Sequence, residues 1–174
     1  MGKKVISFGL SASEIDKAIG EINKYKQEFQ RKVDLYRQRL AEEIANDSQM
    51  GFNSSIVDDI VHGSSRTASV SVTVSHSGDI SVVVANGEDA VWCEFGAGVY
   101  HNGSVGSSPN PYGTELGLTI GSYGKGYGKA NAWGYYDENG QLILTRGTPA
   151  SIPMYHAVQS VTSKAISIAR EVFG

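Results

Sequence analysis

The chain reads Trp92-Cys93-Glu94-Phe95-Gly96-Ala97-Gly98 near its centre and Gly147-Thr148-Pro149-Ala150 just before its last apolar-periodic segment. The segment between them, residues 97–132, is rich in glycine and tyrosine and poor in aliphatic side chains. Connections that lack secondary structure and exceed about 12–15 residues are uncommon in compact domains, and they tend to be functional or disordered. We therefore expect this insertion to be ordered by contacts with other molecules, and the protein to be an interaction protein.

The first motif falls at the end of a short predicted helix, Asp89 to Phe95. The three-residue spacing of Trp92 and Phe95 places both on one side of that helix, towards a sheet. Glu94 then points elsewhere and is left at the surface for a salt bridge within or between subunits. Gly96 and Gly98 indicate a helix stop and a turn.

The second motif opens the C-terminal part of the chain. A hairpin is predicted at residues 133–146, because Asn139-Gly140 lies between two apolar runs. A helix is predicted at residues 152–173, which Ser151 or Pro153 would start. Its apolar stripe consists of Met154, Val158, Val161, Ala165, Ile168 and Val172.

A longer helix is predicted at residues 13–47, after a Ser11-x-x-Glu14 capping box. Its apolar stripe recurs at three- and four-residue steps and consists of Ile15, Ile19, Ile22, Tyr25, Phe29, Val33, Tyr36, Leu40 and Ile44. At 1.5 Å per residue this helix would extend roughly 50 Å, which is longer than a domain of this size is wide. We expect part of the stripe to lie against another subunit.

A second hairpin is predicted at residues 66–86, where valines alternate with serine and threonine. The valines share one face only if Val74 lies opposite Val82 and Val72 opposite Val84, which requires a loop of odd length, most simply three residues. The stretch 50–65 has mixed signals and is expected to be mostly loop. The predicted fold is therefore one α+β domain, residues 1–174, with the two long helices packed on one face of an antiparallel sheet and a long glycine- and aromatic-rich loop at 97–132.

Composition narrows the class of protein. The net charge is −3 and no basic cluster occurs, which argues against nucleic acid as the main ligand. The lone Cys93 excludes an internal disulfide and suggests folding in a reducing cytoplasm, and no apolar run is long enough to span a membrane. The four histidines lack metal-ligand spacing, so we predict neither a metal nor a cofactor.

Three local patterns invite a chemical interpretation. Cys93 beside Glu94 suggests a nucleophile, but a small buried residue next to a surface carboxylate is the better interpretation. Asp58-Asp59 suggests paired carboxylates, but an exposed acidic turn fits better, since neighbours on a strand face opposite ways. The run at 121–129 lacks the spacing of a phosphate-binding loop, and its tyrosines are better interpreted as adaptable contact residues.

Residues Val91 to Gly98 resemble the aromatic/aliphatic-x-Glu-Phe-Gly-Thr-Gly motif of tail-completion, or head–tail joining, proteins of long-tailed bacteriophages. The close of the chain resembles the same family, which typically reads Gly-x-Pro-Ala-x-Pro-Phe/Tyr-Met-x-x-Ala before a C-terminal helix. The chain has Ala97 where the family has threonine, and it reads Ser151-Ile152-Pro153-Met154 instead of Gln-Pro-Phe-Met. The resemblance covers mainly residues 89–173, and the order of the short motifs around a variable insertion is its most specific feature.

The resemblance implies a structural protein of the virion neck, made in the host cytoplasm, that forms a ring, commonly of six copies. Implied partners are copies of itself, the capsid connector, and tail tube or terminator proteins, with incidental contact to DNA in the channel. The residues expected at interfaces or in the structural motifs are Trp92, Glu94, Phe95, Gly96, Gly98, Tyr112, Tyr123, Tyr127, Trp133, Pro149 and Met154.

Three alternatives remain at this point. A tail terminator would have a similar fold and ring geometry. A glycan or cell-wall hydrolase would pair Glu94 with Asp58, Asp59 or Glu115, since glycosidases use two carboxyl groups about 5–9.5 Å apart. A glycan-binding module would use the aromatic residues of the insertion.

Overall fold

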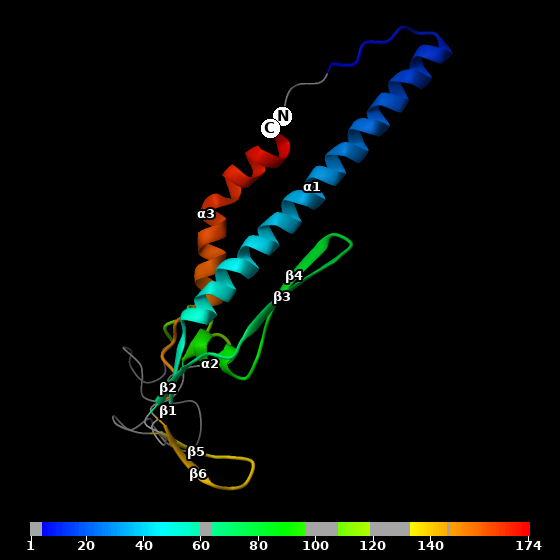
Figure 1. Ribbon diagram of the computed structural model, residues 1–174. Helices are drawn as coiled ribbons and strands as arrows, with labels where there is room; N and C mark the ends of the chain where they lie inside the picture. Colours follow the sequence, from blue (N-terminus) through cyan, green and yellow to red (C-terminus); the bar gives the residue numbers. More distant parts are fainter. Residues whose placement is uncertain (1–4, 60–63, 97–107, 119–132, 146) are drawn as a thin grey trace.

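The computed structural model describes residues 5–59, 64–96, 108–118, 133–145 and 147–174 (Figure 1). It is an α+β fold with two long helices, as predicted. The elements in chain order are α1 (Ala12–Ser54), β1 (Ile56–Asp59), β2 (Ser64–Thr67), β3 (Ser71–Ser77), β4 (Ile80–Asn86), α2 (Asp89–Phe95), β5 (Trp133–Tyr136), β6 (Leu142–Thr145) and α3 (Pro153–Phe173).

Helix α1 is longer than predicted, because it continues through Gly51 to Ser54. At Gly51 a Cβ atom would lie 2.6 Å from the Cβ of Pro153, so glycine allows α1 and the start of α3 to approach closely. The predicted end of this helix at residue 47 is therefore wrong. The spacing of apolar residues could not show that Gly51 stays inside the helix, because its role is to let α3 approach. At the other end Ser11 is the N-cap, but its Oγ bonds the Glu14 carboxylate at 2.5 Å instead of completing the predicted capping box.

Helix α3 packs antiparallel against the C-terminal half of α1 (Figure 1). The hydroxyl of Tyr36 donates to the carbonyl of Ala165 at 3.2 Å, and Ser160 Oγ donates to Asp47 Oδ2 at 2.8 Å. The Phe173 ring lies 6.0 Å from that of Phe29 and 5.9 Å from that of Tyr36. The N-terminal part of α1 projects beyond this last contact (Figure 1).

The described strands form three separate two-stranded antiparallel sheets instead of the single sheet expected. The β1–β2 pair, with Ile56 opposite Thr67, lies largely where a loop was predicted. The prediction failed because these strands are too short and too polar to show an alternation of apolar residues. The β5–β6 hairpin, with Trp133 opposite Thr145, confirms the prediction at 133–146. The hairpin predicted at 66–86 begins later than expected, because residues 66 and 67 belong to β2.

The predicted register of the β3–β4 hairpin is wrong. Ser77 pairs with Ile80 across a two-residue turn, and Val74 pairs with Val83 instead of Val82. Gly78, at the first turn position, has φ +51, and such tight turns match the twist of the flanking strands. Because one slip of register moves a residue to the opposite face, Val82 and Val84 lie on the other face of the hairpin from Val72 and Val74.

The described core lies where the C-terminal end of α1 meets α2. Phe52 and Cys93 are fully buried there, together with Ala68 and Ala90. Met154 from α3 and the inner face of the β3–β4 hairpin pack around this cluster. The core thus holds α2 in place against the start of α3.

Candidate functional site

Glu94 connects the two sequence motifs. Its Oε2 accepts a hydrogen bond from the backbone N–H of Met154 at 2.8 Å. Its Oε1 accepts one from the N–H of Tyr155 at 3.0 Å and one from Asn110 Nδ2 at 2.8 Å. A carboxylate at a helix N-terminus satisfies N–H groups that have no partner inside the helix, and it interacts favourably with the helix dipole. We call this contact, with the Cys93 carbonyl and residues 151–155, the α2–α3 junction.

The carbonyl of Cys93 completes the α2–α3 junction from the backbone. It accepts hydrogen bonds from the N–H of Ser151 at 2.9 Å and from that of Ile152 at 3.0 Å. Ile152 has φ +44, in the left-handed region that a β-branched residue rarely adopts. The two hydrogen bonds help to hold this strained residue, after which Pro153 begins α3 as predicted.

The prediction that Glu94 lies at the surface is wrong. The residue is only 8% exposed. Burial raises the pKa of Glu94 above its ordinary value, although the hydrogen bonds from Met154 and Tyr155, the charge of His156 and the hydrogen bond from Asn110 act in the opposite direction. No local pattern signals this burial, because the N–H groups of Met154 and Tyr155 lie some sixty positions further along the chain.

Asn110 is a site residue that sequence reasoning missed. It is 2% exposed, and its Oδ1 accepts a hydrogen bond from the N–H of Tyr112 at 2.9 Å. The ring of Tyr112 in turn lies 6.2 Å from that of Tyr155. The available signal was its position between Pro109 and Pro111.

The role of Asn110 bears on one expectation about the insertion. Residues 108–118 are held on their own subunit through the α2–α3 junction. Contacts within the chain thus position these residues, and the ordering of the insertion by other molecules stays a prediction. The remainder, residues 97–107 and 119–132, lies outside the described residues.

The first residue of α2, Asp89, forms a second buried contact. Arg66 from β2 donates to both of its oxygens, at 2.6 and 2.9 Å, and the N–H of Ser69 donates at 2.8 Å. Burial raises the pKa of Asp89, but the hydrogen bonds from Arg66 and Ser69 and the charge of Arg66 outweigh it, so the pKa lies below its ordinary value. The two ends of α2 are thus fixed by two carboxylates with opposite pKa shifts.

A pH dependence follows from the lowered pKa of Asp89. Its contribution to stability is present above the ordinary pKa of 3.8 and is lost as the pH falls through the lower value in the folded protein. We expect Asp89→Asn to reduce the free energy of unfolding by about 1–2 kcal/mol at pH 7, a discounted value because the Arg66 side chain is 54% exposed. Urea unfolding at pH 7 and pH 3 should show the gap to wild type narrowing at pH 3. Glu138→Gln, at an exposed position, is the control, and parallel pH curves for wild type and Asp89→Asn would contradict the assignment.

The other predicted site residues are dispersed. Gly96 ends α2, with its N–H bonded to the Trp92 carbonyl at 2.7 Å, and Met154 lies beside the core. Trp92 and Phe95 are partly buried, whereas Tyr112 and Pro149 are exposed. Gly98, Tyr123, Tyr127 and the Trp133 side chain lie outside the described residues.

The described residues do not support Cys93 as a nucleophile or Glu94 as a catalytic carboxylate. Burial raises the pKa of the Cys93 thiol to about 11, which makes it a poor nucleophile at neutral pH. Both oxygens of Glu94, the carboxylate that the hydrolase alternative requires, are occupied by donors of the same chain. Glu115 is exposed in the 108–118 turn, and the side chains of Asp58 and Asp59 are not described.

Two further features are absent from the described part of the chain. It contains no group of three or more histidine, cysteine, aspartate or glutamate side chains that could hold a metal ion. None of its helices has the length and apolar character needed to cross a membrane. An open polar groove of about 560 Å³ lies between α1 and the β3–β4 hairpin and is lined by Gln30, Asp34, Arg37, Gln38, His76, Gly78 and Asp79.

Neither a protein-family profile, nor a characterised protein, nor a solved structure matches this chain.

Proposed function

We propose that this protein is a structural component of the bacteriophage neck, and that several copies form a ring joining the capsid connector to the tail. The observation that carries the proposal is the α2–α3 junction. The two motifs that resemble the tail-completion family lie some sixty residues apart, and Glu94 of the first accepts the N–H groups of Met154 and Tyr155 in the second. This contact gives a physical reason for the two motifs to occur together around an insertion of variable length.

The extent of the surface supports an assembled state. Among the described residues, large apolar side chains such as Ile22, Ile80 and Ile166 are 52%, 64% and 69% exposed, and contiguous exposed apolar surface is typical of interaction sites. A standard protein interface covers about 800 Å² on each partner. A subunit in a ring has two such neighbours, besides the connector and the tail above and below it.

The chemistry of the described residues favours this structural role over hydrolysis. Glu94 holds a helix terminus of its own chain, so a second carboxylate would have no free partner there. A tail terminator has the same requirements for a ring, and the two roles differ in the partner that the ring meets.

Electron microscopy provides the test. The purified protein, alone and mixed with capsid connector and tail proteins of the same virus, is expected to form rings, at the latest when those partners are present. A protein that stays monomeric in the presence of both would contradict the proposal. Binding to the connector alone or to the tail alone separates tail completion from tail termination, and release of soluble fragments from peptidoglycan would favour the hydrolase instead.

A further inference from the structure

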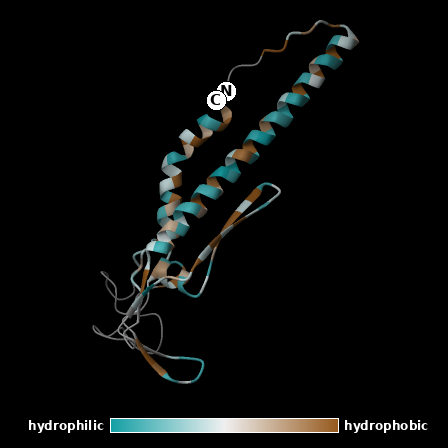
Figure 2. Ribbon diagram, viewed as in Figure 1, coloured by the Kyte–Doolittle hydropathy of each residue, from teal (hydrophilic) through white to brown (hydrophobic). Residues whose placement is uncertain are grey.

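The β4 strand is apolar on both faces. Val83 and Ala85 lie on the half-buried inner face, towards α1, whereas Ile80, Val82 and Val84 are 64%, 46% and 42% exposed on the other. Figure 2 shows the resulting hydrophobic colouring along the hairpin. A nearly continuous aliphatic run is typical of a strand that is covered on both sides. We call Ile80, Val82 and Val84, with their cross-strand partners on β3, the outer hairpin face.

The outer hairpin face is shallow enough to receive a helix. The residues opposite its aliphatic row are Ser77, Ser75 and Thr73, which are all small. The hydroxyl of Thr73 accepts a hydrogen bond from Asn86 Nδ2 at 3.1 Å, so this pair stays satisfied when the face is covered. The face therefore offers apolar contact without burying an unpaired Thr73 hydroxyl.

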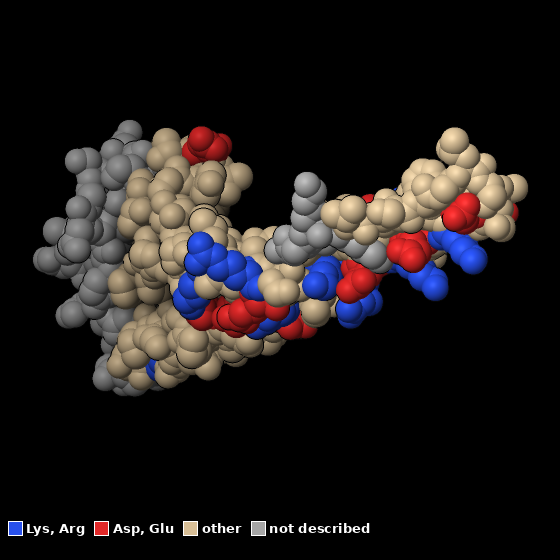
Figure 3. Space-filling model, turned by 90° about the horizontal axis from the view of Figure 1, so that it is seen from above, with Lys and Arg blue, Asp and Glu red and all other residues tan. Residues whose placement is uncertain are grey.

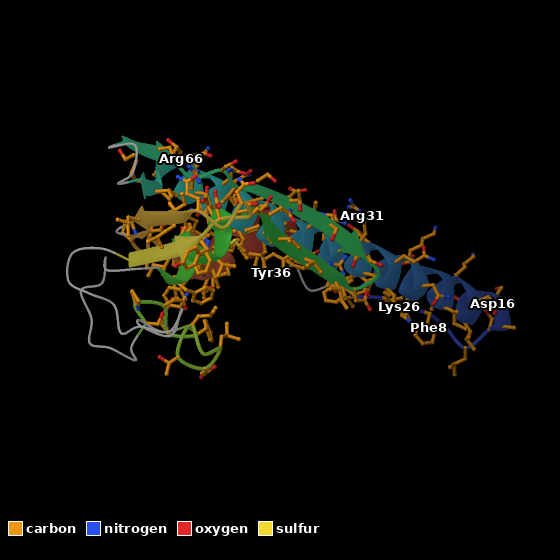
Figure 4. All side chains as sticks on the ribbon, turned by 90° about the horizontal axis from the view of Figure 1, so that it is seen from below. Phe8, Asp16, Lys26, Arg31, Tyr36 and Arg66 are labelled. Atoms are coloured by element: carbon orange, nitrogen blue, oxygen red, sulfur yellow. The ribbon has the colours of Figure 1, made fainter. Side chains whose placement is uncertain are left out.

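A second, partly exposed apolar surface lies on the projecting part of α1. Ile15, Ile19 and Ile22, which we call the isoleucine stripe, are 38%, 50% and 52% exposed. The stripe continues with Phe29 at the seven-residue spacing of a helix–helix seam, and α3 fills that seam from Phe29 onwards. Charged residues of both signs lie along this part of α1 and just beyond it, among them Asp16, Lys26 and Arg31 (Figures 3 and 4).

The two surfaces match in size and kind. The isoleucine stripe spans about 10 Å at 1.5 Å per residue. The aliphatic row from Ile80 to Val84 spans about 13 Å at 3.3 Å per residue. A helix packed by its apolar stripe on the face of a sheet is one of the standard layer arrangements of proteins.

The two surfaces cannot meet within one chain. Arg37 and Asp79 form an ion pair at 3.9 Å, which places the turn of the hairpin level with Arg37 on α1. Ile22 lies roughly 22 Å further along the helix axis at 1.5 Å per residue. A contact between the isoleucine stripe and the outer hairpin face therefore joins two copies.

We propose that the isoleucine stripe of one copy packs on the outer hairpin face of the next copy. The inference rests on the proposed function, since a ring of more than two copies needs two different complementary surfaces on each subunit. A symmetric pairing of two isoleucine stripes would close a dimer and leave the outer hairpin face uncovered. The head-to-tail contact covers both surfaces at once.

Cysteine cross-linking tests the contact. Ile19→Cys and Val82→Cys proteins are mixed under mild oxidation and examined on a non-reducing gel, while the native Cys93, fully buried, stays out of the reaction. A mixed disulfide is expected, and a chain carrying both substitutions should give a ladder of linked copies. In the control mixture Gln159→Cys, exposed on α3, replaces Ile19→Cys and the mixed band should be lost.

Each outcome is informative. Cross-links of Ile19→Cys with itself, or the absence of a mixed disulfide at concentrations where rings form, would overturn the inference. Val82→Lys should abolish ring formation while leaving the thermal unfolding of the monomer unchanged; rings that persist with Val82→Lys would also overturn it. Rings on the connector without the ladder would leave the neck role intact, whereas a ladder from a protein that binds neither connector nor tail would refute the neck role alone.

Discussion

Phe52→Ala is expected to lower the free energy of unfolding by about 3–5 kcal/mol, the range found for large apolar side chains removed from a core. Phe52 is fully buried in the cluster with Ala68, Ala90 and Cys93. These small neighbours have few atoms with which to refill the space, so a cavity would remain. Urea unfolding followed by circular dichroism measures the loss.

Phe29→Ala is the matched control for Phe52→Ala. Phe29 is also on α1 but is 42% exposed, and its described ring contact is Phe173. Its replacement should therefore cost clearly less. Equal losses in the two variants would show that the stability of the protein does not centre on the cluster around Phe52.

Glu94→Gln is expected to lower the free energy of unfolding by about 2–3 kcal/mol, the cost of leaving buried donors without an acceptor. Both carboxylate oxygens accept N–H groups, from Met154 on one side and from Tyr155 and Asn110 on the other. Glutamine has a single oxygen, so in either amide orientation its NH₂ group faces a donor. The variant should also expose α3 residues 154 and 155 to faster amide hydrogen exchange.

Wild type and Glu94→Gln must be compared at one pH. Because burial raises the pKa of Glu94, folding favours its protonated form, so the comparison is made at pH 7, above the ordinary value of 4.5, where the hydrogen bonds to the carboxylate are tested. Glu115→Gln is the control, since Glu115 is an exposed carboxylate in the nearby 108–118 turn. If Glu94→Gln unfolds at the wild-type urea concentration, the carboxylate does not hold the α2–α3 junction.

The junction changes how the Glu-Phe-Gly motif is understood. As a sequence, a glutamate between aromatic residues suggests a surface group that reaches a partner or a substrate. In the structure it is a cap for a helix that begins some sixty residues later. A loss of assembly in Glu94→Gln would consequently be expected from the displaced start of α3, without any contact of Glu94 with a neighbouring subunit.

Local sequence patterns were sufficient to predict the helices and hairpins in which apolar spacing or turn residues are regular. The stripes of the two long helices, the Asn139-Gly140 turn and the helix at Asp89 to Phe95 are local signals, so the α+β class and most element positions followed from the sequence. The C-terminal extension of α1 and the β1–β2 pair did not, because Gly51 and the short polar strands obtain their structure from packing against other elements.

The sequence by itself determined the two long helices, the short helix α2 and the hairpins β3–β4 and β5–β6, since hydrophobic spacing and turn residues act over a few positions. Only the tertiary structure decided that Glu94 and Asn110 are buried against the start of α3, because hydrogen bonds between residues far apart in the chain leave no trace in local spacing. The face on which Val82 lies depends on the length of the hairpin turn, which the spacing of the valines did not predict. A two-residue turn in place of three shifts the pairing by one position and moves every second side chain from the core to the solvent.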